Sequence, residues 1–330
     1  IDMDYSRKIQ FYGPGGENLV EAYIASSVSI EMPGIKGLGH AILVLDKDYL
    51  QLQNFIGTPV HGILGYEVFS RFIVEIDYNK KIITLFEPSE FKKKKKLRTI
   101  PILVQDTKPF VMATIEIDDG GPVDVKLLID TGASHSVMLF NETSFDIQLP
   151  AKNMRSSLGR GLGGQIMGSI GRLDYFDLGG FRLNEVITTF PEKGSYYDSA
   201  LMNYRNGSIG GGILTRLKVT FDYFNQQIYV NKAPGFKRSF KHNMSGLVVK
   251  ATGAKLKEFT VADVRDGSPA GEAGIEQDDK ILSINGISYV DLSLGYINDL
   301  FTSREYRKVN ISLKRNGEKF TKTFRLRRDI

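Results

Sequence analysis

The chain has 330 residues, 42% of them hydrophobic, which is enough for roughly two or three domains with cores of their own. It contains no cysteine, so disulfides, a thiol nucleophile and cysteine-ligated metals are excluded, and no apolar run approaches the roughly 18 residues of a membrane span. The net charge of +5 is partly concentrated in the lysines of residues 92–96, a run without interleaved aromatic residues, so nucleic acid is not an expected partner.

The residue pattern is that of a β-protein along the whole chain. Short runs of β-branched and aromatic residues, bounded by Gly, Asn and Asp, recur at 71–77, 81–86, 110–118 and 226–230. Helices are few. The pattern predicts one short helix around residues 214–217 and a second near residues 294–301.

The sequence repeats itself. Residues 62–78 align without a gap on residues 207–223, an offset of 145, and the two copies share two glycines, an Arg, an Asp-Tyr turn and the apolar pattern. Further upstream, residues 13–16 match residues 161–164 at an offset of 148. The first half of the chain is therefore predicted to be a copy of the second.

A single carboxylate follows an apolar run in the second copy. Asp130, Thr131 and Gly132 come directly after it, and Gly132 permits a tight turn whose N–H is free to hold the carboxylate. The Thr131 hydroxyl can tie one half of the molecule to the other. With the offset of 148, the counterpart of Asp130 falls near position −18, so we expect the second carboxylate upstream, in a segment cleaved off or left out.

The motif KLLIDTGAS at 126–134 resembles the active-site strand and loop of aspartic proteases, specifically the retropepsin-like branch. Residues 208–210 (SIG) and 63–65 (ILG) are similar to the strand that threads beneath that loop. The glycine-rich segments 13–16 and 161–164 resemble flap tips that close over substrate. The resemblance extends to about residue 231 and implies a mainly β, two-lobed acid-protease (retropepsin-like) β-barrel fold.

The resemblance also implies a mechanism. In that family two aspartates, one from each lobe, share a proton and hydrolyse a peptide bond through an activated water. It implies an aspartic endopeptidase that needs no cofactor or metal, acting on a polypeptide laid between the flaps, and this chain alone should be inactive because a single carboxylate cannot be both base and acid. The implied catalytic residues are Asp130, Thr131 and Gly132, and the implied substrate-binding residues of the flaps are Gly13, Pro14, Gly15, Gly16, Gly161, Leu162, Gly163 and Gly164.

Other polar residues are expected to be structural. Asp77 and Asp222 lie in the Asp-Tyr turns of the repeat and have no Thr-Gly behind them. The chain has four histidines, which are too scattered for a metal site and are expected to be structural or exposed: His40, His61, His135 and His242.

From about Asn243 the pattern matches neither repeat. Residues 266–275 and 278–286 resemble a PDZ domain of the bacterial protease-associated type, with Asp278 where that family has Gly. The resemblance implies that an extended peptide adds to a sheet edge, beside a helix near residues 294–301. The implied peptide-binding residues are Met244, Ser245, Gly246, Leu247 and Val248, but the family prefers an apolar residue where Ser245 stands, which leaves capture of a C-terminal carboxylate open.

The predicted organisation has five parts. It comprises an N-terminally truncated first protease lobe at 1–90, a Lys-rich linker at 91–99, a second lobe with the Asp-Thr-Gly motif at 100–232, a linker at 233–242 and a PDZ domain at 243–330. A protease combined with this kind of PDZ domain suggests, by resemblance, a bacterial protein that is periplasmic, attached to the cell surface or secreted.

Two alternatives remain open at the level of sequence. In the first, the protein is a non-catalytic peptide-binding or scaffold protein in which Asp130 is a relic and the PDZ domain carries the function. In the second, a homodimer brings two Asp130 residues together, although the first half of the chain is expected to occupy the surface that such a dimer needs.

Overall fold

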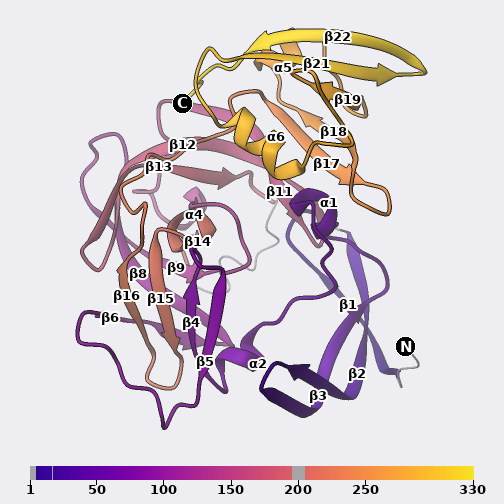
Figure 1. The fold of residues 1–330 in the computed structure, drawn as a ribbon. Coiled ribbons are helices and arrows are strands. Elements are labelled where there is room, and N and C mark those ends of the chain that lie inside the picture. The colour runs from indigo at the N-terminus through magenta and orange to yellow at the C-terminus, as the bar shows by residue number, and fades with distance from the viewer. Residues whose placement is uncertain (1–4, 17, 195–204) are drawn as a thin grey trace.

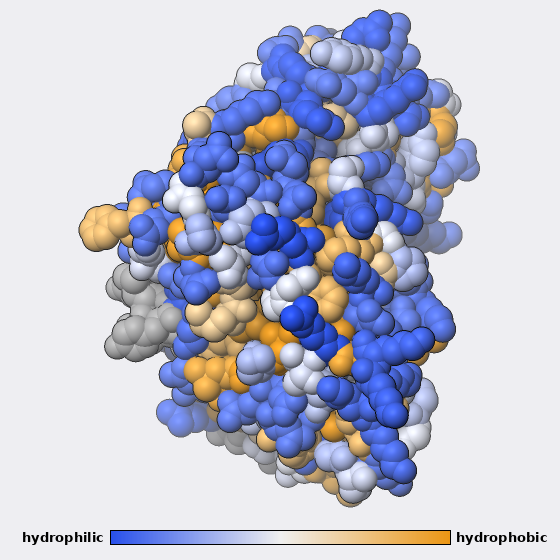
Figure 2. Space-filling view, turned by 90° about the vertical axis from the view of Figure 1, so that its left-hand side faces the viewer, coloured by the Kyte–Doolittle hydropathy of each residue, from blue (hydrophilic) through white to orange (hydrophobic). Residues whose placement is uncertain are grey.

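The computed structural model describes residues 5–16, 18–194 and 205–330, and its secondary structure is mainly β, as predicted. The C-terminal strands, orange to yellow in Figure 1, lie above a magenta barrel, and the first strands, in indigo, stand beside it. On the face shown in Figure 2, apolar side chains gather near the middle and hydrophilic ones surround them.

The first three strands form a sheet of their own, in the order β1-β2-β3. The central strand carries the buried residues Val20, Ala22 and Ala25, and the β1–β2 turn contains residues 13–16. Two short helices follow this sheet. The bounds are β1 Tyr5–Tyr12, β2 Leu19–Met32, β3 Ile35–Leu45, α1 Leu52–Ile56 and α2 Tyr66–Phe69.

The second half closes a barrel. Its eight-stranded sheet has the order β11-β12-β13-β10-β14-β9-β8-β7, and an additional β12–β8 pairing joins six of these strands into a ring. The bounds are β7 Leu103–Gln105, β8 Lys108–Glu116, β9 Val123–Ile129, β10 Val137–Leu139, η1 Asn141–Thr143, β11 Asn153–Gly161, β12 Gly164–Leu178, β13 Phe181–Pro191 and β14 Gly207–Ile209.

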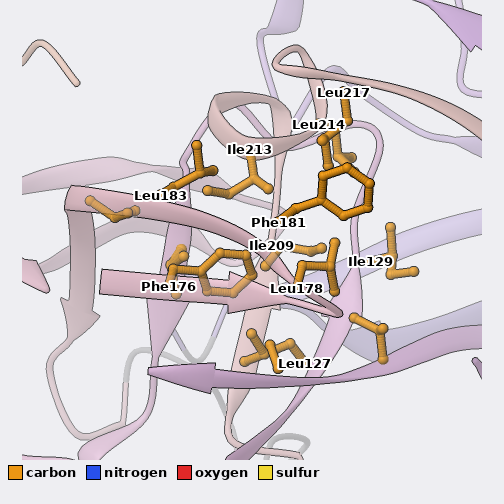
Figure 3. Close-up of a cluster of buried hydrophobic side chains, with 14 of the residues drawn as sticks. Leu127, Ile129, Phe176, Leu178, Phe181, Leu183, Ile209, Ile213, Leu214 and Leu217 are labelled. Carbon is orange, nitrogen blue, oxygen red and sulfur yellow. The ribbon is translucent and has the colours of Figure 1, made fainter. Parts of the chain in front are cut away.

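Alternate residues of the barrel strands point into its interior. In β9, Val125, Leu127 and Ile129 are buried while the residues between them are partly exposed, which is the two-residue period of a strand. Figure 3 shows Leu127 and Ile129 among the other side chains of this core, including Phe176 and Ile209 from β12 and β14. The apolar run before Asp130 is therefore fixed in the barrel core.

A five-stranded sheet joins the two halves in the order β5-β4-β15-β16-β6. Antiparallel pairing between β4 and β15 places Glu75 opposite Thr220, and these two residues are also counterparts in the repeat, at the offset of 145. An approximate twofold axis therefore passes through this pair, which confirms the predicted repeat. The bounds are β4 Ile73–Asp77, β5 Ile82–Phe86, β6 Arg98–Pro101, α4 Gly211–Leu214, β15 Leu217–Asp222 and β16 Gln227–Lys232.

The two halves are not equivalent around this axis. Ile209 and Ile228 of the second half are 0% and 1% exposed, whereas their counterparts Leu64 and Ile83 are 56% and 64% exposed. Residues 63–65 form no strand, so their predicted likeness to the strand beneath the active-site loop is not realised, whereas β14 covers Gly207–Ile209 of the second half. The reason is that β14 lies between β9 and β10, and β16 is covered by β6, but no such neighbours flank the counterparts within the described residues.

The C-terminal part forms a separate sheet and core, with β17 at one edge in the order β17-β18-β19-β21-β22 and β20 paired to β19. The helix predicted near 294–301 is confirmed as α6. The bounds are β17 Leu247–Thr252, β18 Glu258–Val264, α5 Pro269–Glu272, β19 Lys280–Ile284, β20 Ile287–Ser288, α6 Leu294–Phe301, β21 Lys308–Arg315 and β22 Glu318–Arg325.

Three predicted segments differ from the structure. The helix expected at 214–217 is α4, which begins at Gly211, and Leu217 already starts β15, because contacts with the loop after β9 set this helix where propensity alone disfavours one. The segment predicted as linker at 91–99 ends in β6, which pairs with β16. Phe236 and Phe240, within the linker predicted at 233–242, are buried in the first core.

Substitution of Gly207 by Ala tests how closely β14 packs between β9 and β10. A Cβ at Gly207 would lie 1.8 Å from the Met138 carbonyl oxygen, whereas its repeat counterpart Gly62 has open space around it. We expect Gly207→Ala to lower the free energy of unfolding by about 3 kcal/mol and Gly62→Ala to change it by less than about 0.5 kcal/mol, measured by urea denaturation. Equal effects of the two substitutions would contradict this difference between the halves.

The buried side chain of His242 predicts that the stability of the protein depends on pH. Burial, and then the nearby positive Arg172, lower the pKa of His242 to about 4, although Asp329 opposes this and Arg265 and Arg328 add to it. The unfolded chain takes up a proton near pH 6.5, so it binds more protons than the folded one between pH 6.5 and about 4. Above pH 6.5 the neutral His242 costs the folded state nothing. As the pH falls from 6.5 to about 4, the free energy of unfolding decreases.

The variant His242→Phe isolates this contribution, because the substituted side chain cannot titrate. Unfolding free energies of both proteins, measured at intervals from pH 7 to pH 4, should show the wild type losing about 2–3 kcal/mol more than the variant. Parallel pH profiles for the two proteins would show that His242 does not titrate in this way.

Candidate active site and peptide-binding face

The Asp130 carboxylate is held by the backbone that follows it. β9 ends at Ile129, and Asp130 Oδ1 accepts hydrogen bonds from the N–H groups of Gly132, at 3.0 Å, and Ala133, at 3.1 Å. The Asp130 N–H in turn donates to the carbonyl of Ile209 in β14, at 2.9 Å. The predicted role of the Gly132 N–H is confirmed, and the carboxylate has a fixed position on a partly exposed loop.

A run of three glycines supports this loop from beneath. The N–H groups of Gly210, Gly211 and Gly212 donate to the carbonyls of Ser136, Ala133 and His135, with lengths of 3.1, 2.7 and 3.0 Å. A Cβ on Gly210 would lie 2.7 Å from the His135 carbonyl oxygen. Any larger residue would therefore push the loop away from β14 and α4, and the loop owes its position to this close approach.

The side chain of His135 connects the same loop to β14. Its Nε2 lies 2.9 Å from the Ser208 hydroxyl of β14. Burial lowers the pKa of His135, and the negative charge of Asp130 only partly offsets this, so the ring is neutral near pH 7. His135 was expected to be structural or exposed, and its position between the loop and β14 is a structural one.

The first half contributes Tyr78 to the surroundings of Asp130. Burial raises the pKa of the Tyr78 hydroxyl to about 12, and the charge of Asp130 adds to this rise. Within the part of the chain that the structure describes, this buried hydroxyl has no hydrogen-bond partner. The sequence signal that could have found it is the Asp-Tyr turn of the repeat, whose other copy contains Tyr223.

The remaining polar residues near the motif have simpler roles. Thr131 is exposed and its hydroxyl makes no hydrogen bond to any described residue, so its predicted role as a tie between the halves stays a prediction. Asp77 and Asp222 accept hydrogen bonds from the N–H groups of Lys80 and Asn225 in their turns, as expected. No group of three His, Asp or Glu residues suited to a metal occurs among the described residues.

The two glycine-rich segments meet tip to tip. The Gly163 N–H donates to the Pro14 carbonyl at 2.7 Å, and the Asn18 side-chain amide donates to the Gly163 carbonyl at 2.5 Å. A Cβ on Gly15 would lie 2.1 Å from the Gly164 carbonyl oxygen. The structure thus brings together the segments 13–16 and 161–164, and their role as substrate-binding flaps stays a prediction.

The backbone N–H groups of the loop before β17 are hydrogen-bonded within the loop itself. The Asn243 side-chain oxygen accepts from the N–H groups of Ser245, at 2.9 Å, and Gly246, at 3.2 Å, and the Ser245 hydroxyl accepts from the Leu247 N–H at 3.0 Å. These three amides are among those that the PDZ resemblance assigns to a bound carboxylate. Val248 follows in β17 at the sheet edge.

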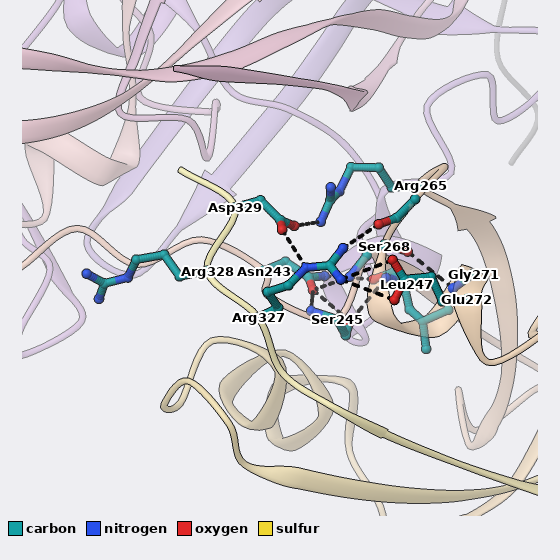
Figure 4. A network of polar contacts seen from close by, with 12 residues as sticks. Asn243, Ser245, Leu247, Arg265, Ser268, Gly271, Glu272, Arg327, Arg328 and Asp329 are labelled. Carbon is teal, nitrogen blue, oxygen red and sulfur yellow. Dashed lines mark hydrogen bonds and ion pairs between the residues drawn. The ribbon is translucent and has the colours of Figure 1, made fainter. Parts of the chain in front are cut away.

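Charged residues of the C-terminal tail surround this loop, as Figure 4 shows. Asp329 pairs with Arg265 at 2.5 Å and with Arg327 at 2.9 Å, and Arg327 also pairs with Glu272. The Ser268 hydroxyl accepts from the Gly271 N–H at the start of α5. The tail is therefore fastened beside the residues predicted to bind peptide.

Family models match two parts of the chain. Residues 111–211 match the model described as aspartyl protease, and residues 260–315 match the model described as PDZ domain. The chain contains an aspartyl protease domain followed by a PDZ domain. The first match includes Asp130, the segment 161–164 and the first two of the three glycines after β14, Gly210 and Gly211, and the predicted resemblance is thus confirmed.

Comparison with curated proteins finds no match. Among solved structures, a photosystem II D1 C-terminal processing protease is 24% identical over 28% of this chain, with a TM-score of 0.25, and the chain spans a quarter of its length. The HtrA-type protease AlgW with decapeptide is 14% identical, with coverage of 94% and 74% and a TM-score of 0.25. A serine endoprotease from Yersinia pestis is 14% identical, with coverage of 96% and 92% and a TM-score of 0.24. Such low scores carry no argument.

Two neighbouring glycines test the contact between the segment tips. Gly15 and Gly16 both have positive φ, at 104° and 135°, but only a Cβ on Gly15 would collide with the opposite segment, since that of Gly16 would lie 3.4 Å from its nearest neighbour. We expect Gly15→Ala to lower the protection of the Gly163 N–H against hydrogen exchange by about tenfold relative to Gly16→Ala. Equal protection in both variants would show that the tips do not meet in solution.

Proposed function

We propose that this chain is the Asp130-bearing part of an aspartic endopeptidase whose PDZ domain binds peptide. The observation that carries the proposal is the Asp130 carboxylate, which is held by two amides above β14. Its own half is related by an approximate twofold axis to a second copy of the same strands. The match of residues 111–211 to aspartyl proteases supports this reading.

The chemistry requires a second carboxylate. In a dyad, like charges a few Å apart cannot both ionise, so one carboxyl group stays protonated while the other activates a water molecule. The ionised group directs the water at the peptide carbonyl, and the acid protonates the leaving nitrogen. Asp130 supplies one of these groups, and a chain with Asp130 alone is expected to be inactive.

The asymmetry of the two halves marks where the second carboxylate would enter. The exposed Leu64 is the counterpart of Ile209, which β9 and β10 cover, and the exposed Ile83 is the counterpart of Ile228, which β6 covers. A segment equivalent to β6, β9 and the Asp130 loop would bury both side chains and place its aspartate across the axis from Asp130. The repeat leads us to expect this segment upstream of the sequence described here.

A homodimer formed through two Asp130 loops is the less favoured arrangement. The edge of β15 that faces the axis is already paired with β4 of the same chain. A second copy would have to displace that pairing. The structural observation therefore favours a dyad completed by a segment that joins the first half.

The location of the protein is proposed on resemblance alone. The combination of a protease and a PDZ domain favours a bacterial protein of the periplasm or cell surface. The described residues include no helix that is both long and apolar enough to cross a bilayer.

The decisive experiment begins with the mass and N-terminal sequence of the native protein. If the native form carries a second Asp-Thr-Gly-like loop, it should cleave casein, be inhibited by a pepstatin-like statine, and lose about 10²–10⁴-fold in rate on Asp130→Asn. The matched control is Asp106→Asn, an exposed turn residue of the same domain, which should leave cleavage unchanged. Activity that survives Asp130→Asn would refute the mechanism, and a folded native form that cuts no peptide pool would favour the scaffold alternative.

A further inference from the structure

The edge of the PDZ sheet is covered by a helix from the first half of the chain. Among the described residues β17 pairs with β18 alone, so its other edge has no strand partner there, and α6 lies beside β17. In the structure α1 lies against both β17 and α6, and Figure 1 shows this indigo helix below the orange strand. The face formed by β17 and α6, which we call the β17–α6 face, is thus occupied by another part of the same chain.

The contact between α1 and this face is close. Gly57 ends α1 in a left-handed conformation, with φ of 79°, and its N–H donates to the Gln53 carbonyl. A Cβ built on Gly57 would lie 2.9 Å from the Cβ of Leu294, the first residue of α6. Only a residue without a side chain leaves room for this approach.

The helix fills the face without satisfying the strand edge. Among the described residues, no backbone hydrogen bond joins α1 to β17, because the N–H and carbonyl groups of a helix turn bond along their own chain. An extended peptide would gain the ladder hydrogen bonds that α1 leaves unmade. The packing of α1 is therefore a contact that a ligand strand can replace.

The loop at the end of the face is not built to hold a free carboxylate. The amides of Ser245, Gly246 and Leu247 are already donated to Asn243 and Ser245, and a terminal carboxylate would have to break these bonds. An internal segment needs none of these amides, and α1 is itself an internal segment. The internally bonded loop and the packing of α1 thus both indicate a ligand that is an internal segment of a polypeptide.

We propose that the β17–α6 face is a docking site for internal apolar segments of polypeptide, that α1 fills it in cis, and that a ligand peptide binds by displacing α1. Binding then does not depend on a free carboxyl terminus. The apparent affinity for a ligand is then the intrinsic affinity multiplied by the fraction of molecules in which α1 is undocked. The proposal does not require that the protease domain be active.

Displacement of α1 would reach both glycine-rich segments. Tyr49, three residues before α1, accepts hydrogen bonds through its carbonyl from Arg160 Nε in β11, at 2.8 Å, and through its hydroxyl from the Glu21 N–H in β2, at 3.1 Å. β11 leads into the segment 161–164, and β2 follows the segment 13–16. The segment just before α1 is therefore hydrogen-bonded to both strands that carry the tips.

The test uses a fluorescent peptide of residues 48–58, made with an amidated and with a free C-terminus, and the full chain. Gly57→Ala should push α1 off Leu294 and raise the affinity for the peptide by about tenfold relative to the wild type. Gly34→Ala is the matched control, because Gly34 has nearly the same φ, 80°, but nothing within 4 Å of its Cβ position. Both peptide forms should bind Gly57→Ala equally.

Two results would overturn the proposal. One is that Gly57→Ala binds no better than Gly34→Ala, and the other is that only the peptide with a free C-terminus binds. A measurement on the unaltered protein keeps the test independent of any variant that fails to fold. Hydrogen exchange of residues 50–57 should speed up when the amidated peptide is added in excess, and unchanged exchange at saturating peptide would count against displacement.

Discussion

The pairing of β4 with β15 is the interaction on which the rest of this molecule depends. It places Glu75 opposite its own repeat counterpart Thr220, so each half of the chain continues the sheet of the other. Because the register of a strand decides which of its faces is buried, this single pairing fixes how the apolar side chains of both halves enter one core. The strands β4 and β5 of the first half take their position relative to the second half from it.

Around this axis the two halves have the same sequence pattern and different surroundings. Residues of the second half are covered by β6, β9 and β10, while Leu64 and Ile83 in the first half face outward. The chemistry follows the same asymmetry, since the half with its full set of strands holds a carboxylate in a fixed position. A proton-sharing pair needs the same support on both sides of the axis. Under the proposed function, the packing of the first half and a carboxylate dyad would both be completed by the same addition, a strand-and-loop unit for the first half.

Two loops in the structure show how local polar groups decide what a site can bind. At Asp130, two backbone amides hold one oxygen of a carboxylate that belongs to the chain. Before β17, the Asn243 side chain and the Ser245 hydroxyl consume the amides that a ligand carboxylate would need. The same donors, backbone N–H groups in a tight turn, present a charge in one case and are satisfied internally in the other. The identity of the nearby polar side chain makes the difference.

The sequence by itself determined the features that depend on local pattern or on comparison of the chain with itself. It located the Asp-Thr-Gly loop, the repeat, the helix at 294–301 and the two domain types, because strand periodicity, glycine turns and repeated motifs are written in neighbouring residues. Only the tertiary structure decided that residues 207–209 form a strand while their counterparts 62–64 do not, that α4 begins at Gly211, and that α1 lies on β17 and α6. The physical reason is that a strand exists only where another strand pairs with it, and a short helix only where other residues pack on it, so these outcomes depend on partners distant in the sequence.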